Sequence, residues 1–129
     1  MENNERKTAI EDDTAIVVTD DQIEEELEET SAGRYVHVFS KPFQWEGKTY
    51  GQLAFNFENL TGRDTLAIER ELAAKHIYMV VRALNLDFQM RVAARACESR
   101  IGIDMLEALP IRDFEKIMNR VRAFFAAAE

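Results

Sequence analysis

Few side chains in this sequence have the types and the spacing that chemistry requires. Its single cysteine, Cys97, could form a nucleophile pair with His37 or His76, in which the imidazole would take the thiol proton. Cys97 falls on the apolar arc of a predicted helix, however, and a free cysteine in that position usually packs as a small hydrophobic residue. His76 stands near a predicted helix end, where the helix dipole favours a protonated imidazole. We therefore predict no catalytic residues.

Carboxylates and glycines offer two further kinds of site. Asp64, Glu69 and Glu71 could act as metal ligands, but their spacing turns Glu69 away from the other two on a helix. One cysteine and two widely separated histidines cannot form a closed zinc site. The five glycines are scattered singly and form no phosphate-binding loop. The sequence therefore predicts neither a metal site nor a cofactor site.

The basic residues do not indicate a nucleic-acid partner. Arg91 and Arg95 could hold an anion, but Glu98 accompanies them, and exposed charge pairs of this kind contribute little. A second group gives the last predicted helix a basic back: Arg112, Lys116, Arg120 and Arg122. Recognition of DNA or RNA needs aromatic side chains or a recognition element beside such a group, and neither is evident.

The charge is unevenly distributed along the 129 residues. Residues 1–33 hold 12 acids and 2 bases, whereas residues 34–129 hold 12 acids and 14 bases. We interpret residues 1–33 as an acidic, flexible tail and residues 34–129 as one folded domain. No apolar run approaches the ~18–20 residues of a membrane span, and the start lacks a secretory signal pattern. A cytoplasmic protein without a membrane partner is expected.

The tail contains two local features. Ala15-Ile16-Val17-Val18 is a short apolar island, and Thr19-Asp20-Asp21-Gln22 has the pattern of a helix capping box. Ile23 and Leu27 then lie one helical turn apart within a run of glutamates. Two interpretations remain open: a solvated tail that keeps the protein soluble, and a segment that folds onto a basic partner surface.

A hairpin followed by helices is predicted beyond the tail. Alternating residues predict strands at residues 35–43 and 49–58, joined by a turn at residues 45–48. Helices are predicted at residues 62–76, 88–100 and 111–125, with a short turn or helix at residues 103–109. Residues 77–81 are ambiguous. The fold class is thus α+β: an N-terminal β-hairpin followed by a bundle of three to four α-helices, preceded by a largely disordered acidic tail.

The helix predicted at residues 111–125 has one apolar face and needs other elements to cover it. Its apolar residues fill one arc of a helical wheel: Ile111, Phe114, Ile117, Met118, Val121, Phe124 and Phe125. Asp113 falls on the opposite, polar side. Pro110 stands where the first turn of a helix tolerates proline.

Aromatic residues are the best candidates for binding another protein, because interface hot spots are rich in them. For Trp45, at the turn of the hairpin, contact with a partner and packing against the helices both remain open. The candidate partner-binding residues are Trp45, Tyr50, Phe55, Phe57, Phe124 and Phe125.

Three segments, taken in order, resemble the small tail assembly chaperones of long-tailed bacteriophages and prophages. The first is Lys41-Pro42-Phe43 with Trp45-Glu46-Gly47-Lys48-Thr49-Tyr50. The second is Leu60-Thr61-Gly62-Arg63-Asp64, followed by Glu69. The third is Leu109-Pro110-Ile111-Arg112-Asp113-Phe114, leading to Val121-Arg122-Ala123-Phe124-Phe125. The resemblance spans about residues 35–126 and leaves the acidic tail out.

This resemblance implies a non-enzymatic protein of the host bacterial cytoplasm. Such chaperones bind the tape measure protein, a long, helical and aggregation-prone chain, and keep it soluble while the tail tube forms around it. The tail tube protein is a second candidate partner, and the hairpin edge with Phe124 and Phe125 favours a homo-oligomer. Two alternatives remain: a structural tail or neck component of the particle, and a small regulatory adaptor that binds proteins.

Overall fold

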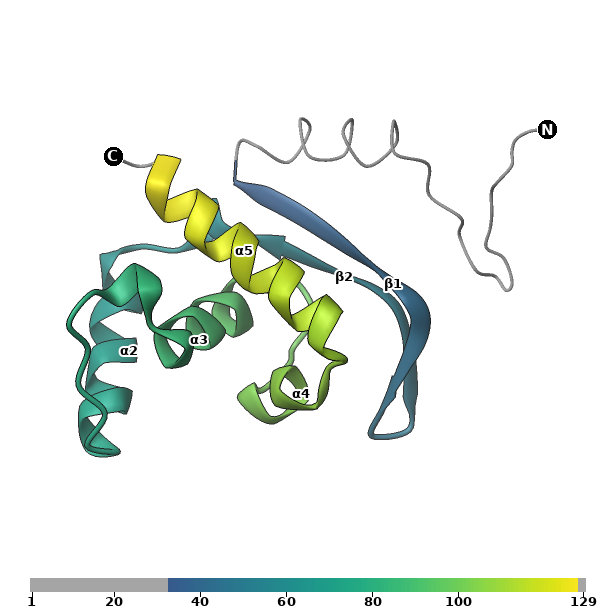
Figure 1. The fold of residues 1–129 in the computed structure, drawn as a ribbon, viewed down its shortest axis with the longest axis horizontal. Coiled ribbons are helices and arrows are strands. Elements are labelled where there is room, and N and C mark those ends of the chain that lie inside the picture. The colour runs from purple at the N-terminus through teal and green to yellow at the C-terminus, as the bar shows by residue number, and fades with distance from the viewer. Residues whose placement is uncertain (1–32, 128–129) are drawn as a thin grey trace.

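The structure, a computed structural model, describes residues 33–127. The predicted acidic tail, with its apolar island and capping box, lies outside the described residues. Within them, an antiparallel hairpin of two strands precedes four α-helices and two short 3₁₀ turns (Figure 1). This arrangement confirms the predicted α+β fold of a hairpin followed by helices.

The hairpin consists of β1 (Arg34–Trp45) and β2 (Lys48–Asn56). Two residues close it, Glu46 and Gly47, both with positive φ (49° and 81°), which suits the right-handed twist of the strands. Val38 pairs with Gln52 but Phe43 pairs with Tyr50, so the register shifts between these pairs. Pro42 lies inside the shifted stretch, where its missing N–H interrupts no ladder hydrogen bond.

One face of the hairpin belongs to the core. Leu53 and Phe55 of β2 are buried, as are His37 and Phe39 of β1. Tyr35 lies opposite Phe55, and His37 lies opposite Leu53. Because side chains alternate along a strand, the apolar face is the predicted one.

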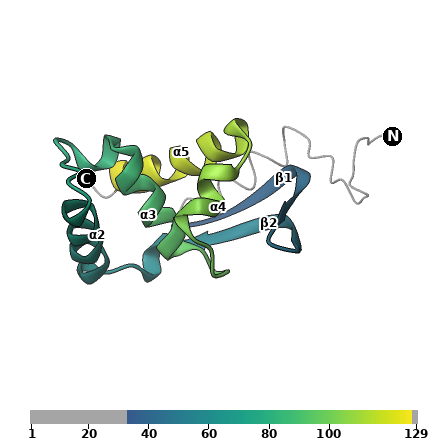
Figure 2. The same ribbon diagram turned by 90° about the horizontal axis from the view of Figure 1, so that it is seen from below.

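Six helical elements follow the hairpin in the described part of the chain. They are η1 (Phe57–Asn59), α2 (Gly62–Ala74), η2 (Arg82–Leu84), α3 (Leu86–Ala96), α4 (Ile103–Ala108) and α5 (Ile111–Ala127). Of these, α3 and α5 contact the strands of the hairpin. In the two views, α3 and α5 lie between the hairpin and α2, and α4 lies near α3 and the start of α5 (Figures 1 and 2). Helix α3 contacts α2, α4, α5 and β2, so it is the central element of the described fold.

Helix α2 begins at the predicted N-cap. The Thr61 N–H donates to Asp64 Oδ2 (2.8 Å), and Thr61 Oγ1 accepts from the Arg63 N–H (3.3 Å). This reciprocal pair of hydrogen bonds satisfies two N–H groups that the first turn would otherwise leave without partners. At its other end the helix stops at Ala74, and His76, two residues later, takes a left-handed conformation with φ 61°.

Helix α3 ends at Ala96, although the sequence predicted a helix as far as residue 100. The backbone becomes extended at Cys97, which forms an isolated antiparallel β-bridge with Phe55 of β2. The Glu98 N–H donates to the Ala54 carbonyl (2.7 Å). The Arg34 guanidinium then pairs with the Glu98 carboxylate (3.0 Å). The free edge of β2 therefore competes with the helix for the backbone of these residues.

Helix α5 has the predicted bounds within two residues but not quite the predicted faces. Ile117, Met118 and Val121 are fully buried, as their arc predicts. Ile111, placed on the same arc, is 74% exposed, whereas Asp113, placed on the polar side, is buried. Asp113 lies inside because it finds a buried hydrogen-bond partner in His37.

Candidate partner-binding surface

Large apolar side chains are exposed on the segment that joins α2 to α3. Val80 is fully exposed, and Tyr78 and Leu84 are 76% and 70% exposed. We call the following set the 78–86 surface: Tyr78, Val80, Val81, Leu84 and Leu86. Leu66, on the first half of α2, is also exposed. Exposed apolar groups that lie together commonly mark sites where another protein binds.

The segment keeps its outer side chains in solvent because its inner ones are fixed. Ile77 and Met79 pack against the core, while Tyr78 and Val80, which alternate with them, are exposed, as an extended chain requires. The Ile77 N–H donates to the Leu72 carbonyl (2.8 Å) at the start of the segment.

Three polar contacts hold the rest of the segment. The Arg82 guanidinium pairs with the Glu69 carboxylate of α2 (2.9 Å). Gln89 of α3 donates to the Ala83 carbonyl (2.5 Å). Asn85 Oδ1 accepts from the Phe88 N–H (2.9 Å) and caps α3. The 78–86 surface is therefore presented by a segment attached at both ends.

A hollow of about 370 Å³ adjoins this surface. It is lined by residues from α2, η2, α3 and α5: Thr65, Arg82, Ala83, Phe88 and Phe125. The Phe88 and Phe125 rings lie 5.7 Å apart, centroid to centroid. Leu66 and Leu84, both exposed, are the chain neighbours of the lining residues Thr65 and Ala83. Such a site suits an apolar side chain projecting from a partner helix.

The structure separates the six aromatic candidates that the sequence predicted. Phe55 and Phe57 are buried in the core, so in the folded chain their role is packing and a partner cannot reach them. Phe124 is half-buried and stacks on Phe57, with ring centroids 5.4 Å apart. Phe125 lines the hollow beside the 78–86 surface. Of these four, Phe125 alone contributes to the candidate surface.

Trp45 ends β1 and Tyr50 pairs with Phe43, so both lie near the hairpin turn. Figure 1 shows that turn far from α2. Both residues are half-buried and pack against the core, and Trp45 stacks on Phe43 (6.3 Å between centroids). They line a small hollow of about 160 Å³ together with residues 100–102 and the start of α4. This geometry favours the packing interpretation of Trp45, and contact of these two residues with a partner stays a proposal.

Sequence reasoning missed the 78–86 surface. The run Ile77–Val81 is apolar enough for a buried strand or a continued helix, and its period decides neither. One signal could have revealed the exposure of this run: it lies between the predicted end of one helix and Asn85, a predicted cap of the next. An apolar segment there has no element of its own to bury it.

The charged residues weighed as ligands are engaged with one another. Arg95 pairs with Asp64 (2.8 Å), and Arg91 pairs with Glu71 (3.4 Å). The hydrogen bond from the Thr61 N–H, and then Arg95, lower the pKa of Asp64. These pairs neutralise the groups that would otherwise hold a metal ion or an anion.

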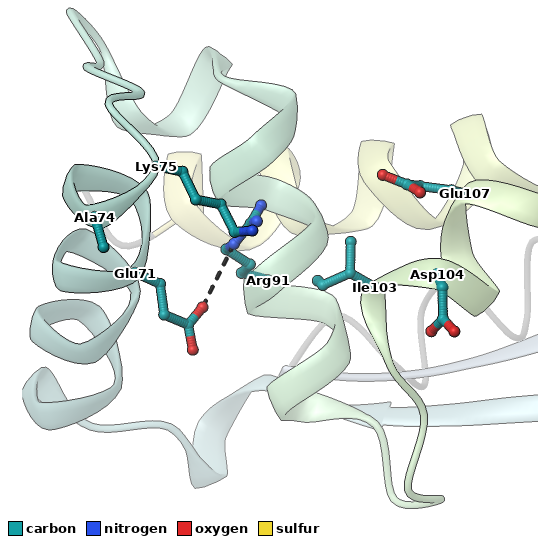
Figure 3. A pocket seen from close by; sticks show the side chains of 7 residues that line it. All are labelled: Glu71, Ala74, Lys75, Arg91, Ile103, Asp104 and Glu107. Atoms are coloured by element: carbon teal, nitrogen blue, oxygen red, sulfur yellow. Dashed lines mark ion pairs between the residues drawn. The ribbon is translucent and has the colours of Figure 1, made fainter.

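A wider hollow of about 640 Å³ lies between α2, α3 and α4 (Figure 3). Figure 3 shows the Arg91–Glu71 pair on one side and Asp104 and Glu107 of α4 on the other. Lys75 also lines it, so its charges are mixed in sign. Across residues 33–127, no three side chains of His, Cys, Asp or Glu converge as metal ligands would.

A buried polar cluster joins β1 to α5. His37 Nε2 lies 2.7 Å from Asp113 Oδ1, and the Tyr35 hydroxyl lies 2.8 Å from His37 Nδ1. A carboxylate only accepts, so Nε2 carries a proton, and the Tyr35 hydroxyl can then donate to the bare Nδ1 of a neutral ring. His37 is 1% and Asp113 6% exposed. A substrate therefore has no access to the ring.

Cys97 does not form a nucleophile pair in this arrangement. Both ring nitrogens of His37 are taken by Tyr35 and Asp113, and His76 is exposed at the end of α2. Burial also raises the pKa of the Cys97 thiol, which disfavours the reactive thiolate.

Acid should destabilise the protein through His37. Burial lowers the pKa of His37 below its ordinary 6.5, outweighing the hydrogen bond to Asp113, which raises it, while Lys116 lowers it further. Below about pH 6.5, His37 therefore binds more protons in the unfolded chain than in the folded one. The free energy of unfolding decreases as the pH is lowered through this range. Urea titrations at a series of pH values between about 7.5 and 5 measure this slope.

Two variants identify the residue responsible for the slope. In His37→Gln the dependence on pH near 6 should flatten, because the titrating ring is gone. His76→Gln, at an exposed position, should keep the slope of the unchanged protein. A slope that persists in His37→Gln would show that another group controls stability in this range.

Comparisons with known proteins identify one family. Residues 37–126 match the family model described as "Phage tail assembly chaperone proteins, E, or 41 or 14". The match spans well over half of the chain and includes most of the hairpin and all four described α-helices. Searches of curated proteins and of solved structures returned no match. In the part of the chain that the structure describes, no helix is long and apolar enough to span a membrane.

Proposed function

This chain belongs to the phage tail assembly chaperone family, and from that premise we propose that it binds the tape measure protein. The complex would form in the host bacterial cytoplasm and keep the tape measure protein soluble while the tail tube is built around it. The chain would act by binding alone, without catalysis. The 78–86 surface is the observation that carries this proposal.

The chemistry of the surface suits a helical client. A long amphipathic helix exposes apolar residues at intervals of three and four, and these residues aggregate unless another surface covers them. The 78–86 surface offers exposed Val80 and Leu84, and the adjoining hollow offers half-buried Phe125. A client helix lying across them would insert one side chain into the hollow and cover the others.

Two finer points belong to the same proposal. The tail tube protein is a second candidate partner, because it must meet the tape measure protein during assembly. Self-association is also proposed: β1 pairs only with β2 in the described sheet, so its outer edge can accept a strand from a second copy.

The test is co-expression with the tape measure protein of the same phage in a bacterial host. With this chain present, the soluble share of the tape measure protein should rise several-fold, and the two proteins should co-purify. Unchanged solubility together with failure to co-purify would contradict the proposed function. A control chain from an unrelated acidic protein of similar size separates a specific effect from general solubilisation.

A further inference from the structure

Helix α5 carries a row of basic side chains along one side. Arg112, Lys116 and Arg120 follow one another at intervals of four residues, about 6 Å apart along the helix. We call them the α5 basic stripe. Arg112 and Lys116 are exposed, and Arg120 lies over the Tyr35 ring at 5.2 Å from its centroid.

The carboxylates of α5 do not pair with Arg112 or Lys116. Asp113 is bound to His37, and Glu115 lies 3.8 Å from Arg122. Among residues 33–127, no carboxylate lies within ion-pair distance of Arg112 or Lys116. At Arg112 and Lys116 the stripe is therefore a net positive surface on an otherwise nearly neutral part of the chain.

The N-terminal segment joins the described fold beside this stripe. The Gly33 carbonyl accepts a hydrogen bond from the Phe57 N–H (2.8 Å), which fixes the point where β1 begins. Tyr35, two residues further on, lies under Arg120. In Figure 1 the start of β1 adjoins the C-terminal half of α5. Residues that precede Gly33 therefore begin next to one end of the stripe.

The residues just before Gly33 have the complementary charge. Residues 20–29 contain seven carboxylates and no base: Asp20, Asp21, Glu24, Glu25, Glu26, Glu28 and Glu29. Three residues separate Glu29 from Gly33, so the two lie at most about 14 Å apart when the chain is extended. The capping box at Thr19–Gln22 predicts a helix here. On that helix the acids would recur every four residues, the same interval as the basic stripe.

We propose that residues 20–29 of this same chain dock on the α5 basic stripe. The short connection favours this occupant over an acidic segment of a second copy, because it holds the acids at a high effective concentration. Each exposed ion pair contributes little by itself, so the docked segment is reversible and sensitive to salt. The acidic segment then covers the basic stripe when no other polyanion occupies it.

Zero-length carbodiimide coupling of the full chain tests this docking, since it joins carboxylates to lysine amines that touch. At low salt, residues 20–29 should couple to Lys116 roughly tenfold more than to Lys75, the C-cap of α2, because docking raises the local concentration. At about 1 M salt, where the screening length is ~3 Å, the preference should disappear. Mass spectrometry of the digested chain counts the joined pairs.

Two controls make the result decisive. Arg112→Glu should reduce coupling to Lys116 several-fold, whereas Arg70→Glu, on the exposed side of α2, should leave it unchanged. A mixture of isotopically light and heavy chains should give pairs within one chain only. Even coupling to Lys41, Lys75 and Lys116 would overturn the proposal. So would pairs that join light to heavy chains, or a preference that neither salt nor Arg112→Glu alters.

Discussion

Replacing Val80 and Leu84 together (Val80→Asp, Leu84→Asp) should weaken binding of the tape measure protein by about 100-fold or more. Interface hot spots contribute about 2 kcal/mol or more each, and every 1.4 kcal/mol is a tenfold change in affinity. Both positions lie on the 78–86 surface, Val80 fully exposed and Leu84 70% exposed. The folded chain buries little of either side chain, so its own stability should change by less than about 0.5 kcal/mol. Titration calorimetry with a soluble tape measure segment measures the affinity.

Ile111→Asp is the matched control for this double variant. Ile111 is 74% exposed and apolar, but it lies on the first turn of α5, outside the 78–86 surface. It should leave the affinity unchanged. If Ile111→Asp weakens binding as much as the double variant does, or if the double variant binds normally, the partner does not use this surface.

Phe55→Ala should lower the free energy of unfolding by about 3–5 kcal/mol, a large share of the ~5–15 kcal/mol typical of a domain. Phe55 is fully buried, and its ring stacks between Tyr35 and Phe57, with centroids 6.3 Å from each. Its backbone also bridges Cys97, so the cavity would open where the hairpin meets the end of α3. Urea unfolding followed by circular dichroism gives the change.

Tyr78→Ala provides the comparison, since it also removes a large aromatic ring, but one that is 76% exposed. Its effect on stability should stay within about 0.5 kcal/mol. A loss for Phe55→Ala as small as the one expected for Tyr78→Ala would show that Phe55 is not part of the core. The two sets of variants therefore separate residues that build the fold from residues that bind a partner.

The hairpin and the start of α2 could be predicted because their signals lie in residues that are close together in the sequence. Leu53 and Phe55 alternate with the smaller or polar residues Gln52, Ala54 and Asn56, and this period of two assigns them to the buried face of a strand. Thr61 and Asp64, three residues apart, form the cap of α2. The start of this helix can therefore be predicted from four consecutive residues.

Other features depend on contacts between residues far apart in the sequence. Asp113 has a polar position on its helical wheel, and only His37, 76 residues earlier, explains its burial. Helix α3 stops at Ala96 because the edge of β2 takes the following backbone. Phe55 and Phe57 have the residue type of interface hot spots, but the same type fills cores, and composition cannot separate the two uses.

The candidate surface was the hardest feature to predict. Apolar residues in the run Ile77–Val81 are compatible with a strand, a helix or a loop, and their exposure follows from where α2 and α3 lie. Phe125 could be identified as a candidate from its type, but its place at the hollow depends on Phe88 of α3.

Hydrogen–deuterium exchange on the complex with the tape measure protein tests the central claim most directly. Amides of residues 77–86 should exchange rapidly in the free chain, because few of them donate to another residue, and should slow by at least about tenfold when the partner is bound. The hairpin turn at Glu46 and Gly47 should exchange equally in both states. If the partner protects the hairpin turn and leaves residues 77–86 unchanged, the chain holds its client elsewhere and the proposed surface is wrong.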